Sequence, residues 1–229
     1  MKLQRWGGVA ALYHGAAYVF AMIFFLVLVD YPGVSDAGEK VSLLVANTGA
    51  MYGMMLVAYI LFGILLVVLS LALHQRLRNQ APALVDVATV FGIIWATILI
   101  AAGMIFNVGM YAVVEMFATN PDRAHTVWTV VELVHDGIGG GSEIVGGVWI
   151  LLLSIAALRN SPSENGASEK RTAVVRPLPR ALNYLGIVIG VAGVLSDIPG
   201  LGEILGIVFG LLQIVWFFWL GSRLIRREG

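Results

Sequence analysis

The stretch GAMYGMMLVAYILFGILLVVLSLAL, residues 49–73, decides the fold class, because its 25 residues carry no charged side chain. At the 1.5 Å rise of an α-helix, about 20 apolar residues cross the roughly 30 Å hydrocarbon core of a bilayer. Within that core the backbone must satisfy its own hydrogen bonds, as an uninterrupted helix does. We therefore interpret residues 49–73 as a membrane-spanning helix.

The composition of the whole chain agrees with this interpretation. Of the 229 residues, 59% are hydrophobic and 12% are charged, whereas a soluble domain has about 45–50% apolar and about 25% charged residues. The sequence thus predicts an all-α, polytopic membrane protein built as a bundle of six transmembrane helices. The predicted spans cover residues 7–29, 49–73, 87–114, a segment within 126–158, 181–196 and 202–221.

The distribution of basic residues predicts the orientation of this bundle. With six spans both termini lie on one side, and 12 of the 14 lysines and arginines fall on that side. Only Lys40 and Arg123 fall on the other. Cytoplasmic loops carry the excess of basic residues, so we expect cytoplasmic termini in a multi-pass protein of the cell membrane.

Polar stretches divide the predicted chain into three parts. We expect a four-helix membrane part over 1–158, a mobile basic cytoplasmic loop over 159–180, and a two-helix hairpin with a basic C-terminus over 181–229. A short helix is expected in the first outer loop, within 31–48. In the hairpin, small residues would allow close helix packing. The glycines expected to meet there are Gly186 and Gly190 on one helix and Gly202, Gly206 and Gly210 on the other.

Three short motifs resemble a known family. They are Arg5-Trp6-Gly7-Gly8, His74-Gln75-Arg76-Leu77, and PRALNYLG at 179–186. The chain resembles bacterial domain-of-unknown-function family 4386, whose members are small multi-helix integral membrane proteins without an assigned activity. The resemblance implies a bacterial source and the cytoplasmic (inner) membrane, and it supplies no catalytic residues.

One polar cluster interrupts the apolar pattern. At 100° per residue Glu132, His135, Asp136 and Glu143 share one helical face. Exposing one ionisable group to mid-bilayer lipid costs roughly 2.5–3.5 kcal/mol, so this face is expected to avoid lipid. We expect a polar pocket in the outer leaflet, completed by Glu115 or Asp197. The glycines of 137–141, however, would break the helix and with it the shared face.

The chemistry of this cluster leaves alternatives open. Carboxylates beside an imidazole suit a divalent cation, a proton site or the polar end of a small ligand, but no recognised metal motif is present. The segment would equally serve as a wetted helix end. The metal and the cofactor therefore stay unknown. The four histidines lie at different predicted depths, which disfavours a haem held by two of them, and His14 is interpreted as a hydrogen-bonded core histidine.

These patterns favour a protein that serves as a binding or structural module in the membrane. Such a module would also suit a subunit of a larger complex. No motif of a hydrolase is present, so an enzyme is not expected. The alternative is a small proton- or cation-coupled transporter. Expected partners are membrane lipids, other membrane subunits or a second copy of the chain. Nucleic acid is not expected, because the formal net charge is zero.

Overall fold

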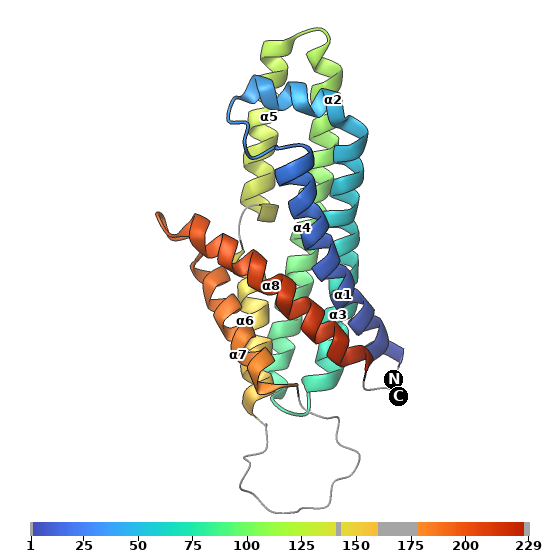
Figure 1. Cartoon of the computed structure of the whole chain (residues 1–229), viewed down its shortest axis with the longest axis vertical. Helices are drawn as coiled ribbons and strands as arrows, with labels where there is room; N and C mark the ends of the chain where they lie inside the picture. Colours follow the sequence, from blue (N-terminus) through green and yellow to red (C-terminus); the bar gives the residue numbers. More distant parts are fainter. Residues whose placement is uncertain (1, 141–142, 160–177, 227–229) are drawn as a thin grey trace, which may run out of the picture. The chain divides into compact units, whose positions relative to one another are not determined.

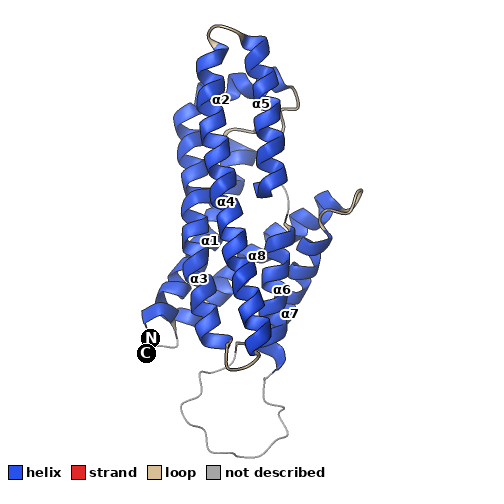
Figure 2. Cartoon of the chain, turned by 180° about the vertical axis from the view of Figure 1, so that it is seen from behind, coloured by secondary structure: helices blue, strands red, loops and turns tan. Residues whose placement is uncertain are grey.

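The prediction of an all-α protein is confirmed for the part of the chain that the structure describes. The computed structural model describes residues 2–140, 143–159 and 178–226, and no strand occurs among them (Figure 1, Figure 2). The α-helices of these residues are α1 (Lys2–Ile23), α2 (Ala37–Met55), α3 (Phe62–Leu77), α4 (Pro82–Phe117), α5 (Pro121–His135), α6 (Ile144–Arg159), α7 (Arg180–Leu195) and α8 (Gly202–Ile225). Short π-helical segments are η1 (Phe24–Leu28), η2 (Leu56–Leu61) and η3 (Asp136–Gly140).

Among the residues that the structure describes, five helical stretches are long and apolar enough to cross a membrane. They run over Leu3–Leu28, Ala37–Leu77, Pro82–Phe117, Pro121–Arg159 and Gly202–Ile225. Each overlaps one of the predicted spans. The remaining predicted span, 181–196, coincides with α7, which is apolar but has only 16 residues. By the length and composition of its helices, the chain is a multi-pass membrane protein.

Helix is present within the first predicted loop, 31–48, but it is the start of α2, which continues beyond the loop to Met55. Asp36 precedes this helix, and its Oδ1 accepts hydrogen bonds from the backbone N–H groups of Gly38 (2.9 Å) and Glu39 (3.0 Å). These are donors that the first turn of a helix otherwise leaves unpaired. At Asn47 the backbone leaves helical geometry (φ −121°, ψ 18°). Figure 1 shows that α2 changes direction along its length.

By their internal contacts the residues form two compact units, which we describe separately. Unit 1 comprises residues 1–12, 66–94 and 143–229, and unit 2 comprises 13–65 and 95–142. The helices α1, α3 and α4 contribute to both units. The grouping therefore does not follow the chain-order parts 1–158, 159–180 and 181–229. Most of the predicted 159–180 loop, residues 160–177, lies outside the described residues.

Unit 2 has a core of methionine and aromatic side chains. Phe106 packs edge to face against Trp128, with ring centroids 5.0 Å apart. Methionine is flexible and fills irregular gaps beside such rings. The buried members of this core are Phe24, Val41, Leu44, Met51, Met54, Met55, Phe106, Met110, Val113, Ala124 and Trp128.

The interpretation of His14 as a hydrogen-bonded core histidine is confirmed. Its side chain is fully buried in unit 2, its Nε2 lies 3.0 Å from the carbonyl oxygen of Phe62, and its ring packs against the Phe62 ring. The neighbouring Tyr13 hydroxyl donates a hydrogen bond to the carbonyl oxygen of Val57 at 2.7 Å. The carbonyl of Val57 lies in η2, and that of Phe62 lies directly after it. In a π-helical segment the i→i+5 pattern replaces the regular backbone hydrogen bonds of the α-helix.

In unit 1 the helices α6 and α7 approach closely through glycines. A Cβ atom at Gly147 would lie 2.7 Å from the nitrogen of Val194 and 2.9 Å from the oxygen of Gly190. A Cβ atom at Gly190 would lie 2.8 Å from the oxygen of Gly147. Only residues without a side chain allow this approach of two backbones, which gains dispersion contacts in lipid.

The predicted glycine contact between the last two helices is wrong for α8. Although α7 and α8 pack together, no described atom lies within 4 Å of a Cβ position at Gly206 or Gly210. Instead Phe209 of α8 packs against Gly193 of α7, with ring carbons within 2.8 Å of the Cβ position. The space beside Gly193 is therefore filled by a large α8 side chain, and a glycine on α8 is not needed there.

Candidate functional site

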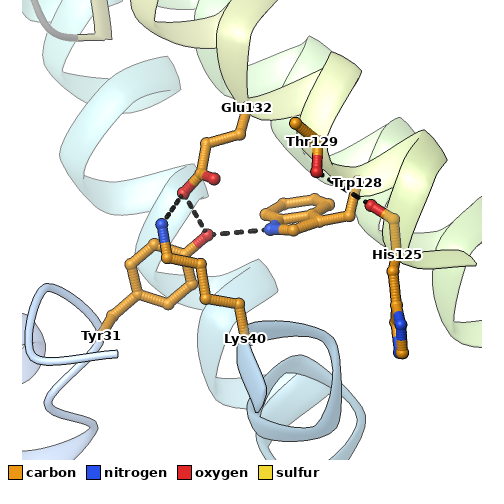
Figure 3. Close-up of polar contacts among 6 residues, drawn as sticks. All are labelled: Tyr31, Lys40, His125, Trp128, Thr129 and Glu132. Atoms are coloured by element: carbon orange, nitrogen blue, oxygen red, sulfur yellow. Dashed lines mark hydrogen bonds and ion pairs between the residues drawn. The ribbon is translucent and has the colours of Figure 1, made fainter. Parts of the chain in front are cut away.

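Four side chains of unit 2 form one connected polar network (Figure 3). The Lys40 Nζ lies 2.6 Å from Glu132 Oε1, and the Tyr31 hydroxyl donates a hydrogen bond to the same oxygen at 2.9 Å. The Trp128 indole N–H in turn donates to the Tyr31 hydroxyl oxygen at 3.0 Å. The Lys40 ammonium also lies 5.2 Å from the centre of the Tyr31 ring, within cation–π range. We call these four residues the latch.

The latch is largely shielded from solvent. The side chains of Lys40 and Glu132 are 19% and 24% exposed, and Trp128 is fully buried. Burial raises the pKa of the Tyr31 phenol above its ordinary value, and the Glu132 carboxylate raises it further through its charge and its hydrogen bond. The hydrogen bond from Trp128 acts in the opposite direction. The phenol therefore stays protonated and serves as a donor to Glu132.

Local structure brings the latch residues together from three segments. Tyr31 follows η1 at a sharp turn in which Asp30 adopts a positive φ of 49° and the Tyr31 N–H donates to the Phe25 oxygen. Lys40 lies in the first turn of α2. Trp128 and Glu132 lie four residues apart on α5, so they occupy neighbouring positions on one helical face. The latch thus joins the α1–α2 connection, α2 and α5.

The predicted pocket residues of α5 make different direct contacts, although Asp136 lies close enough to Glu132, His135 and Lys40 for their charges to act on it. Glu132 binds Lys40 and Tyr31. His135 is buried, its Nδ1 lies 3.0 Å from the carbonyl oxygen of Ala102, and its ring packs against Tyr59 and Phe106. Asp136 is exposed at the start of η3.

The shared helical face expected for the cluster ends at η3. Gly139 has φ 141°, a left-handed conformation that glycine adopts without strain, so the helix does not continue from Asp136 to Glu143. Glu143 and the exposed Asp197 belong to unit 1, whereas Glu115, also exposed, belongs to unit 2. Among the described residues, no group of three or more His, Asp or Glu side chains is placed to hold a metal ion.

The latch contains three residues that the sequence prediction did not include: Tyr31, Lys40 and Trp128. The contact of Lys40 with Glu132 could have been predicted, because Lys40 is one of only two basic residues predicted on the outer side. A half-buried carboxylate needs a cation, and a lysine on the same side is the simplest source. Tyr31 and Trp128 gave no such signal, since aromatic residues are common at both membrane interfaces.

The arrangement neutralises charge and joins three segments. The cation next to Glu132 is the Lys40 ammonium of the same chain, and the second group at that oxygen is a phenol. Within the latch, Glu132 Oε1 accepts from Lys40 and Tyr31, and the Tyr31 hydroxyl oxygen accepts from Trp128. Its chemistry is that of a tertiary contact.

Comparison with known proteins adds no relative: no family model, no curated protein and no solved structure matches the chain. Membership of family 4386 therefore stays a prediction based on short apolar motifs.

Proposed function

We propose that this chain is a six-span protein of the bacterial cytoplasmic membrane with both termini in the cytoplasm. The split of 12 basic residues against 2 supports this orientation, as does the apolar character of five long helices and of α7. The 16 residues of α7 extend about 24 Å at 1.5 Å per residue, which is short for a 30 Å core. Local thinning of the bilayer would accommodate a helix of this length.

We further propose that the protein is a structural or binding module and not an enzyme. The observation that carries this proposal is the contact of the Glu132 carboxylate with Lys40 and Tyr31 at 2.6 and 2.9 Å. A carboxylate satisfied by its own chain is poorly suited to take up and release an external cation. The latch instead supports a role in fixing the α1–α2 connection against α5.

The partners proposed for such a module are membrane lipids, other membrane subunits or a second copy of the chain. If the resemblance to family 4386 reflects common ancestry, the members of that family would share the role of a structural or binding module.

A flux measurement tests the proposal against the transporter alternative. The purified protein is reconstituted into liposomes, and proton and Na⁺ entry are followed after a gradient is imposed. We expect entry at the rate of protein-free vesicles, both for the natural chain and for Glu132→Gln.

Gradient-driven entry that exceeds the protein-free rate and is lost in Glu132→Gln would contradict the structural assignment. The exposed Glu39, in the same first turn of α2, provides the matched control. Glu39→Gln removes a carboxylate of equal size without touching the latch, so a specific transport role of Glu132 would leave this variant active.

A further inference from the structure

The interior of unit 1 contains polar side chains that are almost completely buried in an apolar surrounding. Ser154 of α6 is 2% exposed, Asn183 of α7 is 2% exposed and Trp216 of α8 is 3% exposed. Among the described residues, Ser154 Oγ, Asn183 Nδ2 and Trp216 Nε1 have no hydrogen-bond partner. Buried polar groups in proteins are nearly always hydrogen-bonded, so three such atoms in one small region require an explanation.

Two of these atoms converge on one point. A Cβ atom at Gly186 of α7 would lie against Ser154 Oγ and 3.0 Å from Trp216 Nε1. The absence of a side chain at Gly186 thus brings a hydroxyl from α6 and an indole N–H from α8 to the same place. Asn183 lies one turn earlier on the same helix as Gly186. The Trp216 ring also packs edge to face on the Trp149 ring, with centroids 6.0 Å apart, which fixes its orientation.

The chemistry of these groups identifies what they would bind. An indole nitrogen is a donor only, an amide nitrogen is a donor, and a hydroxyl donates as well as accepts. All three groups are neutral, and burying an anion beside neutral groups alone is costly. Their common partner is therefore a neutral oxygen acceptor.

We propose that Ser154 and Trp216, with Asn183 one turn away, form an internal binding site for a neutral oxygen atom. That oxygen belongs either to an ordered water molecule or to the carbonyl group of a membrane-soluble molecule. Buried water commonly satisfies otherwise unpaired polar groups, and an acceptor in lipid has few other donors to meet. This site lies in unit 1, and it is independent of the latch and of the function proposed above.

The hydrogen-bonding state of the Trp216 indole tests the site directly. Ultraviolet resonance Raman spectra report whether an indole N–H is hydrogen-bonded, and the difference between the natural chain and Trp216→Phe isolates this one tryptophan. We expect the signature of a hydrogen-bonded indole. The exposed Trp6 supplies the control, because Trp6→Phe should leave the Trp216 signal in place.

Ser154→Ala provides the second variant. In an occupied site the hydroxyl helps to hold the oxygen, so its removal should weaken the hydrogen-bond signature of Trp216. Ser222 is the matched control, since its hydroxyl already donates to the Trp219 oxygen at 2.8 Å, and Ser222→Ala should leave the signature unchanged.

Solvent extraction of the purified protein followed by mass spectrometry distinguishes the two sources. A membrane-soluble carbonyl compound recovered near one per chain, and lost in Trp216→Phe, identifies a bound molecule. A hydrogen-bonded Trp216 without a recovered compound identifies water if the signature is weakened but kept in Ser154→Ala. Complete loss of the signature in Ser154→Ala would show that the Ser154 hydroxyl itself accepts the indole N–H, and would overturn the proposal. A free indole N–H at Trp216, together with a higher melting temperature of Ser154→Ala, would show a dry site and overturn the proposal.

Discussion

At the residue scale, the contact between Lys40 and Glu132 has the properties of a stabilising ion pair. Both side chains are less than a third exposed, so solvent screening is reduced relative to a surface pair. The same oxygen of Glu132 also accepts the Tyr31 hydrogen bond. Removing one charged partner of a shielded pair leaves the other without compensation, which costs more than replacing both by neutral groups.

This asymmetry predicts the outcome of a double-mutant cycle. Lys40→Met should lower the free energy of unfolding by about 2 kcal/mol, because the carboxylate stays without its cation. Adding Glu132→Gln should recover part of that loss, which gives a coupling energy of about 1 kcal/mol. Thermal unfolding of the four proteins in detergent measures the cycle, and strict additivity would contradict the contact.

The Tyr31 phenol predicts a dependence on alkaline pH. Its pKa is raised in the folded protein, first by burial and then by Glu132, with Asp136 adding a smaller effect. The stability that it contributes is therefore fully present below about pH 10, the unfolded value, and is lost as the pH rises toward the folded value. Lys40 faces the same ring, with its Nζ 5.2 Å from the ring centre.

Absorbance titration of tyrosinate in the natural chain and in Tyr31→Phe measures this difference. We expect the Tyr31 signal to appear only above the ordinary tyrosine range, and to appear at lower pH in Glu132→Gln. A Tyr31 that titrates at about pH 10 in both backgrounds would contradict the described environment.

At the element scale, glycines decide which helices of unit 1 approach each other. The contact of Gly147 with Gly190 brings the backbones of α6 and α7 together, whereas the α8 glycines at 206 and 210 have no described neighbour within 4 Å of a Cβ position. A large side chain is therefore expected to lower stability at Gly190 and to leave it unchanged at Gly206 and Gly210.

Replacing Gly190 by Leu should force α6 and α7 apart and lower the free energy of unfolding by about 1–3 kcal/mol or more. Gly206→Leu adds the same side chain to α8 without a neighbour to displace, so its melting temperature should equal that of the natural chain. Equal destabilisation by both substitutions would contradict the packing described for unit 1.

The sequence predicts the helices far better than it predicts their contacts. Long apolar runs and the polar turn at 196–200, where Gly200 has φ 83°, locate the spans and the connection between α7 and α8. A row of glycines, however, shows only that some backbone approaches, not which one. The partners of Glu132 lie 92 and 101 residues away along the chain, and a helical wheel compares positions on one helix only.

At the scale of the whole molecule, the central proposal is that the chain crosses the membrane six times. The charge distribution supports six crossings, because they leave two basic residues on the outer side. The shortest of the six proposed crossings is α7, with 16 residues. If α7 did not cross, the turn at Asp197 would lie in the cytoplasm and the C-terminus would lie outside.

Single-cysteine labelling tests this claim most directly, because the natural chain contains no cysteine. Cysteine is introduced at the exposed positions Ser35, Asn79 and Asp197, one at a time. A membrane-impermeant maleimide is then added to right-side-out and inverted vesicles. Six crossings predict that Ser35→Cys and Asp197→Cys react in right-side-out vesicles and Asn79→Cys in inverted ones. Reaction of Asp197→Cys only in inverted vesicles would contradict the claim.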